Sequence, residues 1–199
     1  MAMSNTPLFS FGRIDDHQEL VSKHYRFESR LVDGLEWDFS HLEAFVLKVP
    51  VILPPNVATT IDVVVLFSNH CFTRAIYPNE TLEQNWLFED DREIRALDKE
   101  RYDLSKQHLL TIVKQLPLRR ILVADPNRPN SVTIEIPHSK KQEPQQYAVF
   151  FELERDKIRQ KRVLLRIQSA YILEQKTKRL QQAEKINFSV LLRKAYLRG

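Results

Sequence analysis

The stretch that most limits the fold is residues 147–173, which reads as two β-strands joined by a charged loop, YAVFFELERDKIRQKRVLLRIQSAYIL. Side chains on a strand alternate between its two faces, so Val149, Phe151 and Leu153 share one face of the first arm. A hairpin whose loop is centred near Ile158 makes that face apolar on both arms. The opposing pairs are then Phe151 and Leu165, Val149 and Ile167, and Leu153 and Val163.

The other face of this hairpin mixes apolar with charged and polar side chains: Phe150, Glu152, Leu164, Arg166 and Gln168. That mixture is typical of a sheet that is packed on one side and partly open on the other. A slip of one residue would bury Glu152 or Arg166 in the core, so the pattern favours this pairing.

Shorter patterns predict the other strands, which are residues 25–32, 43–53, 62–67, 120–124 and 131–136. Residues 62–67 are apolar on both faces, and we expect them to form a central strand covered on both sides. The pair Asp33 and Gly34 signals a turn. Pro50 lacks the N–H that a ladder requires, which places its strand at an edge or a bulge.

Helical spacing of apolar residues predicts one helix over residues 101–116, which Pro117 ends, and a second over residues 187–197. Residues 81–99 have a weaker helical pattern. In the last helix the side chains expected to share an apolar face are Phe188, Leu191, Leu192 and Ala195.

The predicted fold class is α+β: a mainly antiparallel twisted sheet with a helix-containing insertion after the central strand and a C-terminal helix. We expect residues 1–18 to be a flexible arm and residues 19–199 to be a single domain. Within that domain, residues 19–56 are expected to be an N-terminal hairpin extension and residues 57–199 the main sheet with its helices.

Composition excludes several classes of protein. With 43% hydrophobic and 28% charged residues, the chain is neither disordered nor membranous. The N-terminus lacks the features of a secretory signal, so we expect a cytoplasmic protein. Cys71 is the single cysteine, which excludes an internal disulfide and a zinc site built on paired cysteines. None of the three glycines forms a phosphate-binding loop, so we expect neither a nucleotide cofactor nor a metal.

The net charge is +4 and the sequence pI about 9.2, which favours an acidic partner such as RNA or an acidic protein surface. Most of the excess lies in residues 155–198. The candidate nucleic-acid contacts are Lys161, Arg162, Lys176, Arg179, Arg193 and Lys194. The alternative is that these cations form an ordinary solvated surface.

From residue 62 onward the predicted order is a strand, a helical region and several antiparallel strands. The stretch YAVFFELERD followed by KRVLLRIQSAYIL is similar to the pair of terminal strands in a family of small toxins. In these respects the chain resembles the RelE/ParE-type toxin superfamily over about half of its length. The resemblance implies a metal-independent ribonuclease that acts on messenger RNA, often at the ribosome, and that a partner protein inhibits. Arg166 and Tyr171 lie in the strand that matches the catalytic one. The basic cluster that follows this strand in the family is replaced here by Gln168, Ser169 and Ala170.

Metal-independent RNA cleavage needs a base, an acid and positive charge beside the phosphate. The candidate catalytic residues are His70, Arg74, Glu152, Arg166 and Tyr171. Each also has a structural explanation. His70 and Arg74 would be ordinary strand-end residues, Glu152 and Arg166 an ion pair, and Tyr171 a packed aromatic.

Two functions therefore remain open. One is a ribonuclease of toxin or defence type that uses a basic sheet face. The other is a non-catalytic interaction module that binds a protein or nucleic acid through the sheet and the basic C-terminal helix. A compact cluster of His70, Arg74, Glu152 and Arg166 would favour the enzyme, and an apolar surface or free sheet edge would favour the module.

Overall fold

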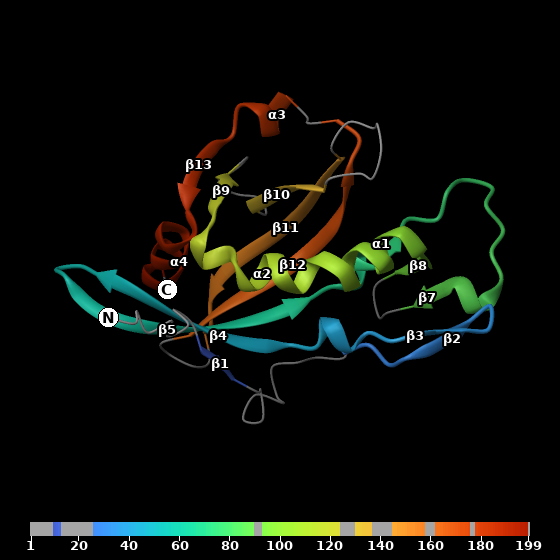
Figure 1. The fold of residues 1–199 in the computed structure, drawn as a ribbon, viewed down its shortest axis with the longest axis horizontal. Coiled ribbons are helices and arrows are strands. Elements are labelled where there is room, and N and C mark those ends of the chain that lie inside the picture. The colour runs from blue at the N-terminus through green and yellow to red at the C-terminus, as the bar shows by residue number, and fades with distance from the viewer. Residues whose placement is uncertain are drawn as a thin grey trace, which may run out of the picture.

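The computed structural model describes residues 10–12, 26–89, 93–123, 130–136, 145–157, 162–175 and 178–198. These residues form an α+β fold in which most strand pairs are antiparallel (Figure 1). A helical segment follows the central strands and another helix ends the chain. The predicted class is confirmed, but the described strands form three sheets rather than one.

The largest sheet has eight described strands, in the spatial order β1 (Ser10–Gly12), β4 (Phe45–Leu53), β5 (Val57–Phe67), β12 (Arg162–Leu173), β11 (Gln145–Arg155), β10 (Asn130–Ile136), β9 (Arg120–Val123) and β13 (Glu184–Asn187). The two small sheets are the hairpin β2 (Arg30–Val32) with β3 (Leu35–Trp37), and the group β6 (Thr73–Arg74), β8 (Ile94–Leu97) and β7 (Leu87–Glu89).

The longer helical segments are α1 (Lys99–Leu104), the π-helical turn Ser105–Leu109, α2 (Leu110–Lys114), α3 (Lys178–Gln181) and α4 (Phe188–Leu197). The 3-10 turns are η3 (Ser40–Leu42), η4 (Asn69–Cys71), η5 (Gln84–Trp86) and η7 (Leu116–Leu118). The predicted helices over residues 101–116 and 187–197 are thus confirmed in outline.

The strand β5 is central, as predicted, and it pairs with β4 on one side and β12 on the other. Val63 and Val65 are buried on one face of it, and Val64 and Leu66 on the other. The pairing with β12 is parallel and joins residues 62–67 to residues 162–167. Parallel neighbours are usually covered on both faces, which explains the continuous apolar run.

The hairpin β11–β12 forms with a register two residues away from the predicted one. Phe151 lies opposite Ile167 and Leu153 opposite Leu165. A shift of two residues keeps the side chains of residues 151–155 and 163–167 on their predicted faces, so the apolar pattern there does not distinguish the two registers. The last pair is Arg155 with Val163, and a buried ion pair between Asp156 and Arg162 lies just beyond it.

A β-bulge in β12 is the feature of this hairpin that the sequence did not reveal. Phe150 faces Ser169 while Phe151 faces Ile167, so Gln168 is an extra residue on β12. Beyond the bulge the alternation is reversed, and Ala170 is buried in the core. The bulge lies where β12 leaves its partner β5.

The predicted helical pattern of residues 81–99 needs correction, and the predicted turn before β3 does not. Residues 81–99 contain the strands β7 and β8 instead of a helix, because residues 95–97 are all buried in the small sheet against β6. The turn at Asp33 and Gly34 is confirmed, with φ of 49° and 76°.

That turn joins β2 to β3, whereas β4 pairs with β5 and belongs to the main sheet. The expected N-terminal extension is therefore not one hairpin. Described residues of β1 pair with residues 46–48, so no described strand lies beside Pro50 on that side of β4, which fits the expected edge position. Of the expected flexible arm, residues 10–12 form β1 and the rest lies outside the described residues.

The main core lies between the large sheet and the helical segments. The segment α1–α2 crosses in front of β11 and β12 in Figure 1, and Leu109, Ile112 and Val113 are buried in one cluster with Phe151. Phe188 and Leu192 of α4 belong to the same cluster, which confirms the predicted apolar face of that helix. No helix among the described residues is long and apolar enough to cross a membrane.

Candidate functional site

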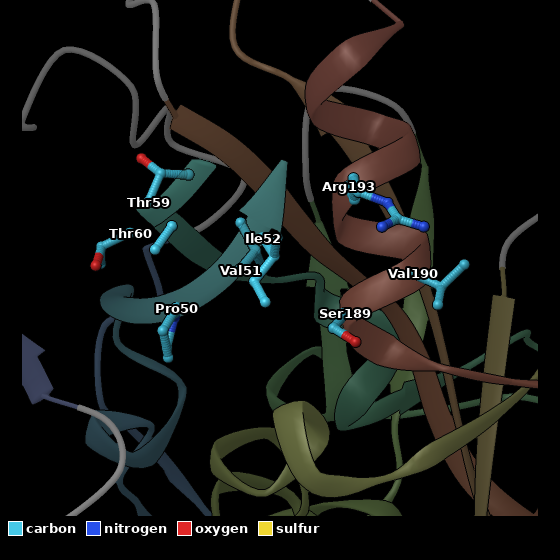
Figure 2. A pocket seen from close by; sticks show the side chains of 9 residues that line it. Pro50, Val51, Ile52, Thr59, Thr60, Ser189, Val190 and Arg193 are labelled. Carbon is cyan, nitrogen blue, oxygen red and sulfur yellow. The ribbon is translucent and has the colours of Figure 1, made fainter. Parts of the chain in front are cut away.

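A groove of about 640 Å³ lies between the β4–β5 hairpin and the first turns of α4 (Figure 2). Its walls come from both elements: Pro50, Val51, Ile52, Ala58, Thr59, Thr60, Ser189, Val190 and Arg193. Arg193 is the only ionisable residue among them. Ile52 is 61% exposed and Val57, at the start of β5, is 55% exposed. The groove is therefore an open, largely apolar channel with one cation.

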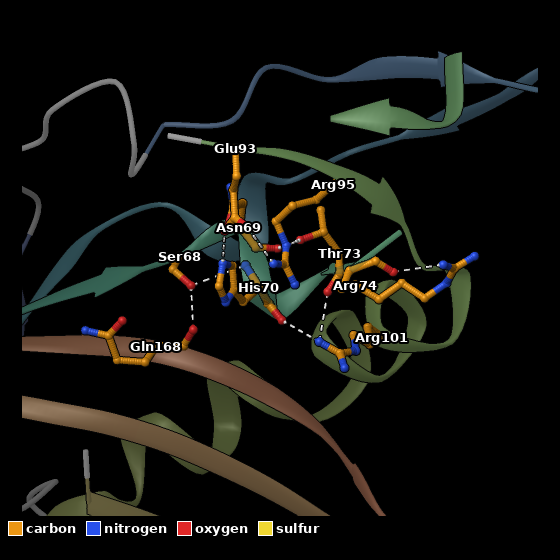
Figure 3. A network of polar contacts seen from close by, with 10 residues as sticks. Ser68, Asn69, His70, Thr73, Arg74, Glu93, Arg95, Arg101 and Gln168 are labelled. Carbon is orange, nitrogen blue, oxygen red and sulfur yellow. Dashed lines mark hydrogen bonds and ion pairs between the residues drawn. The ribbon is translucent and has the colours of Figure 1, made fainter. Parts of the chain in front are cut away.

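Two of the predicted catalytic residues, His70 and Arg74, lie elsewhere, just after the point where β5 leaves the large sheet (Figure 3). The turn η4 follows β5 directly, and Ser68 caps it. The Ser68 hydroxyl accepts a hydrogen bond from the His70 N–H at 3.2 Å and donates one to the Gln168 carbonyl at 2.7 Å. Ser68 therefore fixes His70 beside the bulge of β12.

His70 has a carboxylate partner that the sequence did not reveal. Its Nε2 lies 2.8 Å from Oε1 of Glu93, and its side chain is 38% exposed. Arg95 donates to the other oxygen of Glu93 at 3.1 Å. Burial alone would raise the pKa of Glu93, but the hydrogen bonds and charges of His70 and Arg95 hold it below its ordinary value. The pair could move a proton at the surface.

Arg74 binds a different carboxylate, that of Glu80. Two of its nitrogens bind Glu80 at 2.8 and 2.5 Å, and its guanidinium lies 4.5 Å from the centre of the Tyr77 ring. The hydrogen bond from Arg74, with a further one from the Tyr77 N–H, lowers the pKa of Glu80 to about 2. This bidentate contact orders the loop after β6.

The other three candidates are spread along the hairpin. Arg166 forms an ion pair with Glu154, while Glu152, directly opposite Arg166 in the register, accepts a hydrogen bond from Gln168 at 3.1 Å. Tyr171 lies further along β12, between the guanidinium of Arg101 and the ring of Phe150 (5.4 Å between ring centres).

Arg101 is a second residue of this region, besides Glu93, that sequence reasoning missed. Its Nη1 donates to the carbonyls of His70 (3.3 Å) and Thr73 (2.8 Å), and its guanidinium lies 4.7 Å from the Tyr171 ring centre. It therefore joins α1 to η4, β6 and β12. Arg101 opens a predicted helix far from these strands in the sequence, so no local pattern links it to them.

Among the described residues, which leave out residues 90–92 next to Glu93, positive charge does not accumulate around His70. Each nearby arginine has a carboxylate partner: Arg74 with Glu80, Arg95 with Glu93, and Arg101 with Asp98. The three cations and three anions cancel. A site that binds an RNA phosphate needs an excess of cations, because the affinity comes from neutralising phosphates.

Three of the six candidate nucleic-acid contacts have described side chains. Arg162 is buried, with its side chain 5% exposed, and is paired with Asp156, so it offers no exposed cation. Arg193 lines the groove and Lys194 is exposed on the same helix. Lys161, Lys176 and the side chain of Arg179 lie outside the described residues.

Metal chemistry has no visible site in the part of the chain that the structure describes. Those residues hold no group of three or more His, Cys, Asp or Glu side chains that could bind a metal ion. Cys71 is fully buried, and burial raises the pKa of its thiol to about 12, which fits a structural thiol rather than a nucleophile.

Comparison with known proteins gives one match. A family profile described as the YjaZ family matches residues 24–196. No curated protein and no solved structure matches this chain.

Proposed function

The chain belongs to the YjaZ family, and we propose that it is a non-catalytic interaction module that binds an acidic, partly apolar segment of a partner protein in the groove between the β4–β5 hairpin and α4. The observation that carries the proposal is the combination of an open apolar channel with a single cation. An apolar groove of this kind is a common recognition surface for peptide segments.

The groove exposes apolar surface to water. Ile52 and Val190 line the groove and Ile52 keeps 61% of its surface exposed, whereas Val51 beside them is already buried, at 7% exposed. Burying such side chains against a partner is favourable in proportion to the apolar area that leaves water. The hydroxyls of Thr59, Thr60 and Ser189 supply hydrogen-bonding groups along the same channel.

The charge of the groove selects the partner. Residues 50–60 contain no ionisable side chain, and α4 contains no acidic one. Arg193 thus sets the electrostatic potential, with Lys194 next to it on the helix. A partner segment with a carboxylate among apolar side chains would complement both features, whereas a second copy of this groove would bring two Arg193 cations together.

Protein fits this surface better than RNA does. RNA affinity depends on several cations that neutralise successive phosphates, and one cation lines this groove. Sequence-tolerant RNA binding also uses exposed aromatic rings, and no aromatic residue lines it.

The experiment is a peptide-display selection on the intact immobilised protein, followed by fluorescence polarisation with the enriched peptides. We expect enriched sequences to combine apolar residues with Asp or Glu. Arg193→Glu and Ile52→Asp should each weaken binding about tenfold or more, because a hydrogen-bonded charge pair and a buried apolar anchor contribute on that scale.

The matched control is Lys194→Glu, which makes the same charge change on the same helix outside the groove. It should retain most of the affinity. A selection without enrichment, or peptides that bind all three variants equally, would overturn the proposal. Preferential binding of a single-stranded RNA or of anionic vesicles through Arg193 would also overturn it.

A metal-independent ribonuclease is the second candidate, and the His70–Glu93 hydrogen bond at 2.8 Å is the observation that favours it. The test is cleavage of structured and unstructured RNA in the presence of EDTA. We would expect activity in the native protein and its loss in a combined His70→Ala and Arg166→Ala variant, with His108→Ala as the control. Absence of cleavage by the folded native protein would eliminate this candidate for free RNA.

A further inference from the structure

The outer part of the β4–β5 hairpin projects from the large sheet (Figure 1). Among the described residues, β1 pairs with residues 46–48 of β4 and β12 pairs with residues 62–67 of β5. Residues 49–61 therefore pair with each other alone in the described part of the chain. This projecting segment contains no ionisable side chain. An exposed hairpin without charge marks an interaction surface, either for a protein or for a membrane.

The tip of this hairpin, residues 52–58, exposes apolar side chains on both of its faces. Asn56 is the one polar residue in its sequence, ILPPNVA. Ile52 is 61% exposed and Val57 is 55% exposed. Val57 lies opposite Leu53, the neighbour of Ile52 along β4, so the alternation of a strand puts Ile52 and Val57 on opposite faces. A protein surface covers one face of such a hairpin, whereas lipid surrounds an inserted tip on all sides.

The backbone of the tip suits an apolar environment. The strand ladder continues to the pair of Leu53 and Val57, and the Asn56 N–H donates to the Leu53 carbonyl at 2.8 Å. Pro54 and Pro55 have no N–H. Residues 54–56 therefore present no free N–H group at the end of the hairpin. An unpaired N–H is costly in lipid, so a turn closed in this way can leave water at a lower cost.

Positive charge lies beside the apolar tip. In Figure 2 the labelled residues of β4 and of the first turns of α4 rise in the same direction as their numbers increase, so α4 ends toward the tip. Lys194 and Arg198, near that end, are exposed, and α4 contains no acidic side chain. Cations beside an apolar insertion are attracted to the anionic headgroups of a membrane surface.

We propose that the chain attaches to an anionic phospholipid surface, with residues 52–58 inserted at the level of the headgroups and with Lys194 and Arg198 against the lipid charges. Stable attachment to a membrane surface usually takes two contributions, such as an apolar insertion and a basic patch. This end of the molecule supplies both. The proposal does not rest on the peptide groove, because Val57, Lys194 and Arg198 do not line that groove.

The test is co-sedimentation of the full chain with vesicles of equal parts phosphatidylcholine and phosphatidylserine, in parallel with vesicles of phosphatidylcholine alone. We expect saturable binding to the mixed vesicles and binding about tenfold weaker, or less, to the neutral ones, because the neutral surface lacks the attraction for the cations.

Val57→Asp tests the tip. It should weaken binding to the mixed vesicles about tenfold or more, because it places a charge in the inserted segment. The matched control is Leu35→Asp, since Leu35 is 59% exposed and lies on another hairpin, β2–β3. This control should bind like the native protein.

A double charge reversal tests the basic end of α4. Lys194→Glu with Arg198→Glu should weaken binding to the mixed vesicles about tenfold or more. Lys178→Glu with Lys185→Glu makes the same change of charge on α3 and β13, which lie away from the tip in Figure 1. That control should have a clearly smaller effect.

An environment-sensitive thiol probe separates insertion from adsorption by charge. Cys71 is buried, so Val57→Cys supplies the accessible thiol. The probe attached there should become brighter and emit at shorter wavelength when the mixed vesicles are added, because it leaves water. The same probe attached to Leu35→Cys should not change.

Absence of binding of the native protein to the mixed vesicles at millimolar lipid would overturn the proposal and would assign the apolar tip to a protein partner. Binding that Val57→Asp leaves unchanged, or that gives no probe signal at position 57, would overturn it too, because it would show adsorption without insertion. The groove is tested with peptides, so either failure leaves that proposal standing.

Discussion

At the scale of single residues, His41 is a histidine whose neutral form the fold requires. Its Nε2 lies 2.8 Å from the Ser105 hydroxyl, and that hydroxyl donates to the Tyr102 carbonyl, so His41 Nε2 must be the donor. The Nδ1 atom is then an unprotonated acceptor, buried without a described partner. Burial, with a further effect of Lys106, lowers the pKa of His41 against the opposing influence of Asp38.

This arrangement predicts a pH-dependent stability. The pKa of His41 is 6.5 in the unfolded chain and lower in the folded one. Above pH 6.5 both states are neutral and the stabilisation is complete. As the pH falls below 6.5 the unfolded state takes up the proton first, so the free energy of unfolding decreases. Urea unfolding at pH 5.5 and 7.5 should show a larger difference in the native protein than in His41→Gln. An equal difference in both would contradict this assignment.

The buried ion pair of Asp156 and Arg162 gives a second prediction. Their side chains are 2% and 5% exposed. Removing one partner leaves a buried charge uncompensated, so Arg162→Ala should lower the free energy of unfolding by about 3–5 kcal/mol. The double variant Asp156→Leu with Arg162→Met should be less destabilised than Arg162→Ala. Urea denaturation measures both. A loss below about 1 kcal/mol for Arg162→Ala would mean that water reaches the pair.

Sequence reasoning at this scale predicted where a side chain lies in the fold better than it predicted which side chains contact it. It placed His70 just beyond a buried strand, because the apolar run of residues 62–67 ends there. It did not find Glu93 or Arg101, which lie 23 and 31 residues further along the chain. Contacts of that kind depend on the fold, and no spacing in the sequence encodes them.

At the scale of elements, the bulge at Gln168 determines which side chains of β12 face the core. Ala170 is buried and Ser169 is partly exposed, which is the reverse of an unbroken alternation from Ile167. Bulges redirect side chains in this way at the ends of paired segments. The bulge turns Tyr171 toward Phe150 and Arg101.

A pair of variants tests this reversal. Ala170→Leu inserts a larger side chain into packed core and should cost about 1–3 kcal/mol of unfolding free energy. Ser169→Leu makes a similar increase in size on the more open face and should change stability by about 0.5 kcal/mol or less. Thermal or urea unfolding compares them. The opposite ranking would show that β12 runs without the bulge.

Elements with a strong period were predicted well, and elements without one were not. The apolar positions of residues 101–116 follow a helix closely, and Leu109, Ile112 and Leu116 are buried as that spacing requires. Residues 81–99 have no clear period, and the small sheet, rather than local propensity, decides their conformation. The predicted register of the main hairpin differs from the observed one by two residues, because a shift of two leaves the alternation of apolar and polar side chains unchanged.

At the scale of the whole molecule, the central sheet joins distant parts of the chain. Val65 lies beside Leu165 in the parallel pair β5–β12. A parallel pair leaves no turn signal in the sequence, so the α+β class was predictable and the strand order was not. Pairing over such a separation also favours slow folding, in the range of milliseconds to seconds.

Cys71 is a buried thiol, and its burial also makes it a reporter of core opening. It lies in η4 and is inaccessible in the folded chain. A thiol reagent can modify it only after that region opens, and with one cysteine in the sequence every labelled molecule reports the same event. Labelling under native conditions should be slow and should rise with urea in parallel with global unfolding. Labelling that is fast and independent of urea would instead reveal a local opening at η4, beside His70, and at saturating reagent its rate would be the rate at which the end of β5 separates from the sheet.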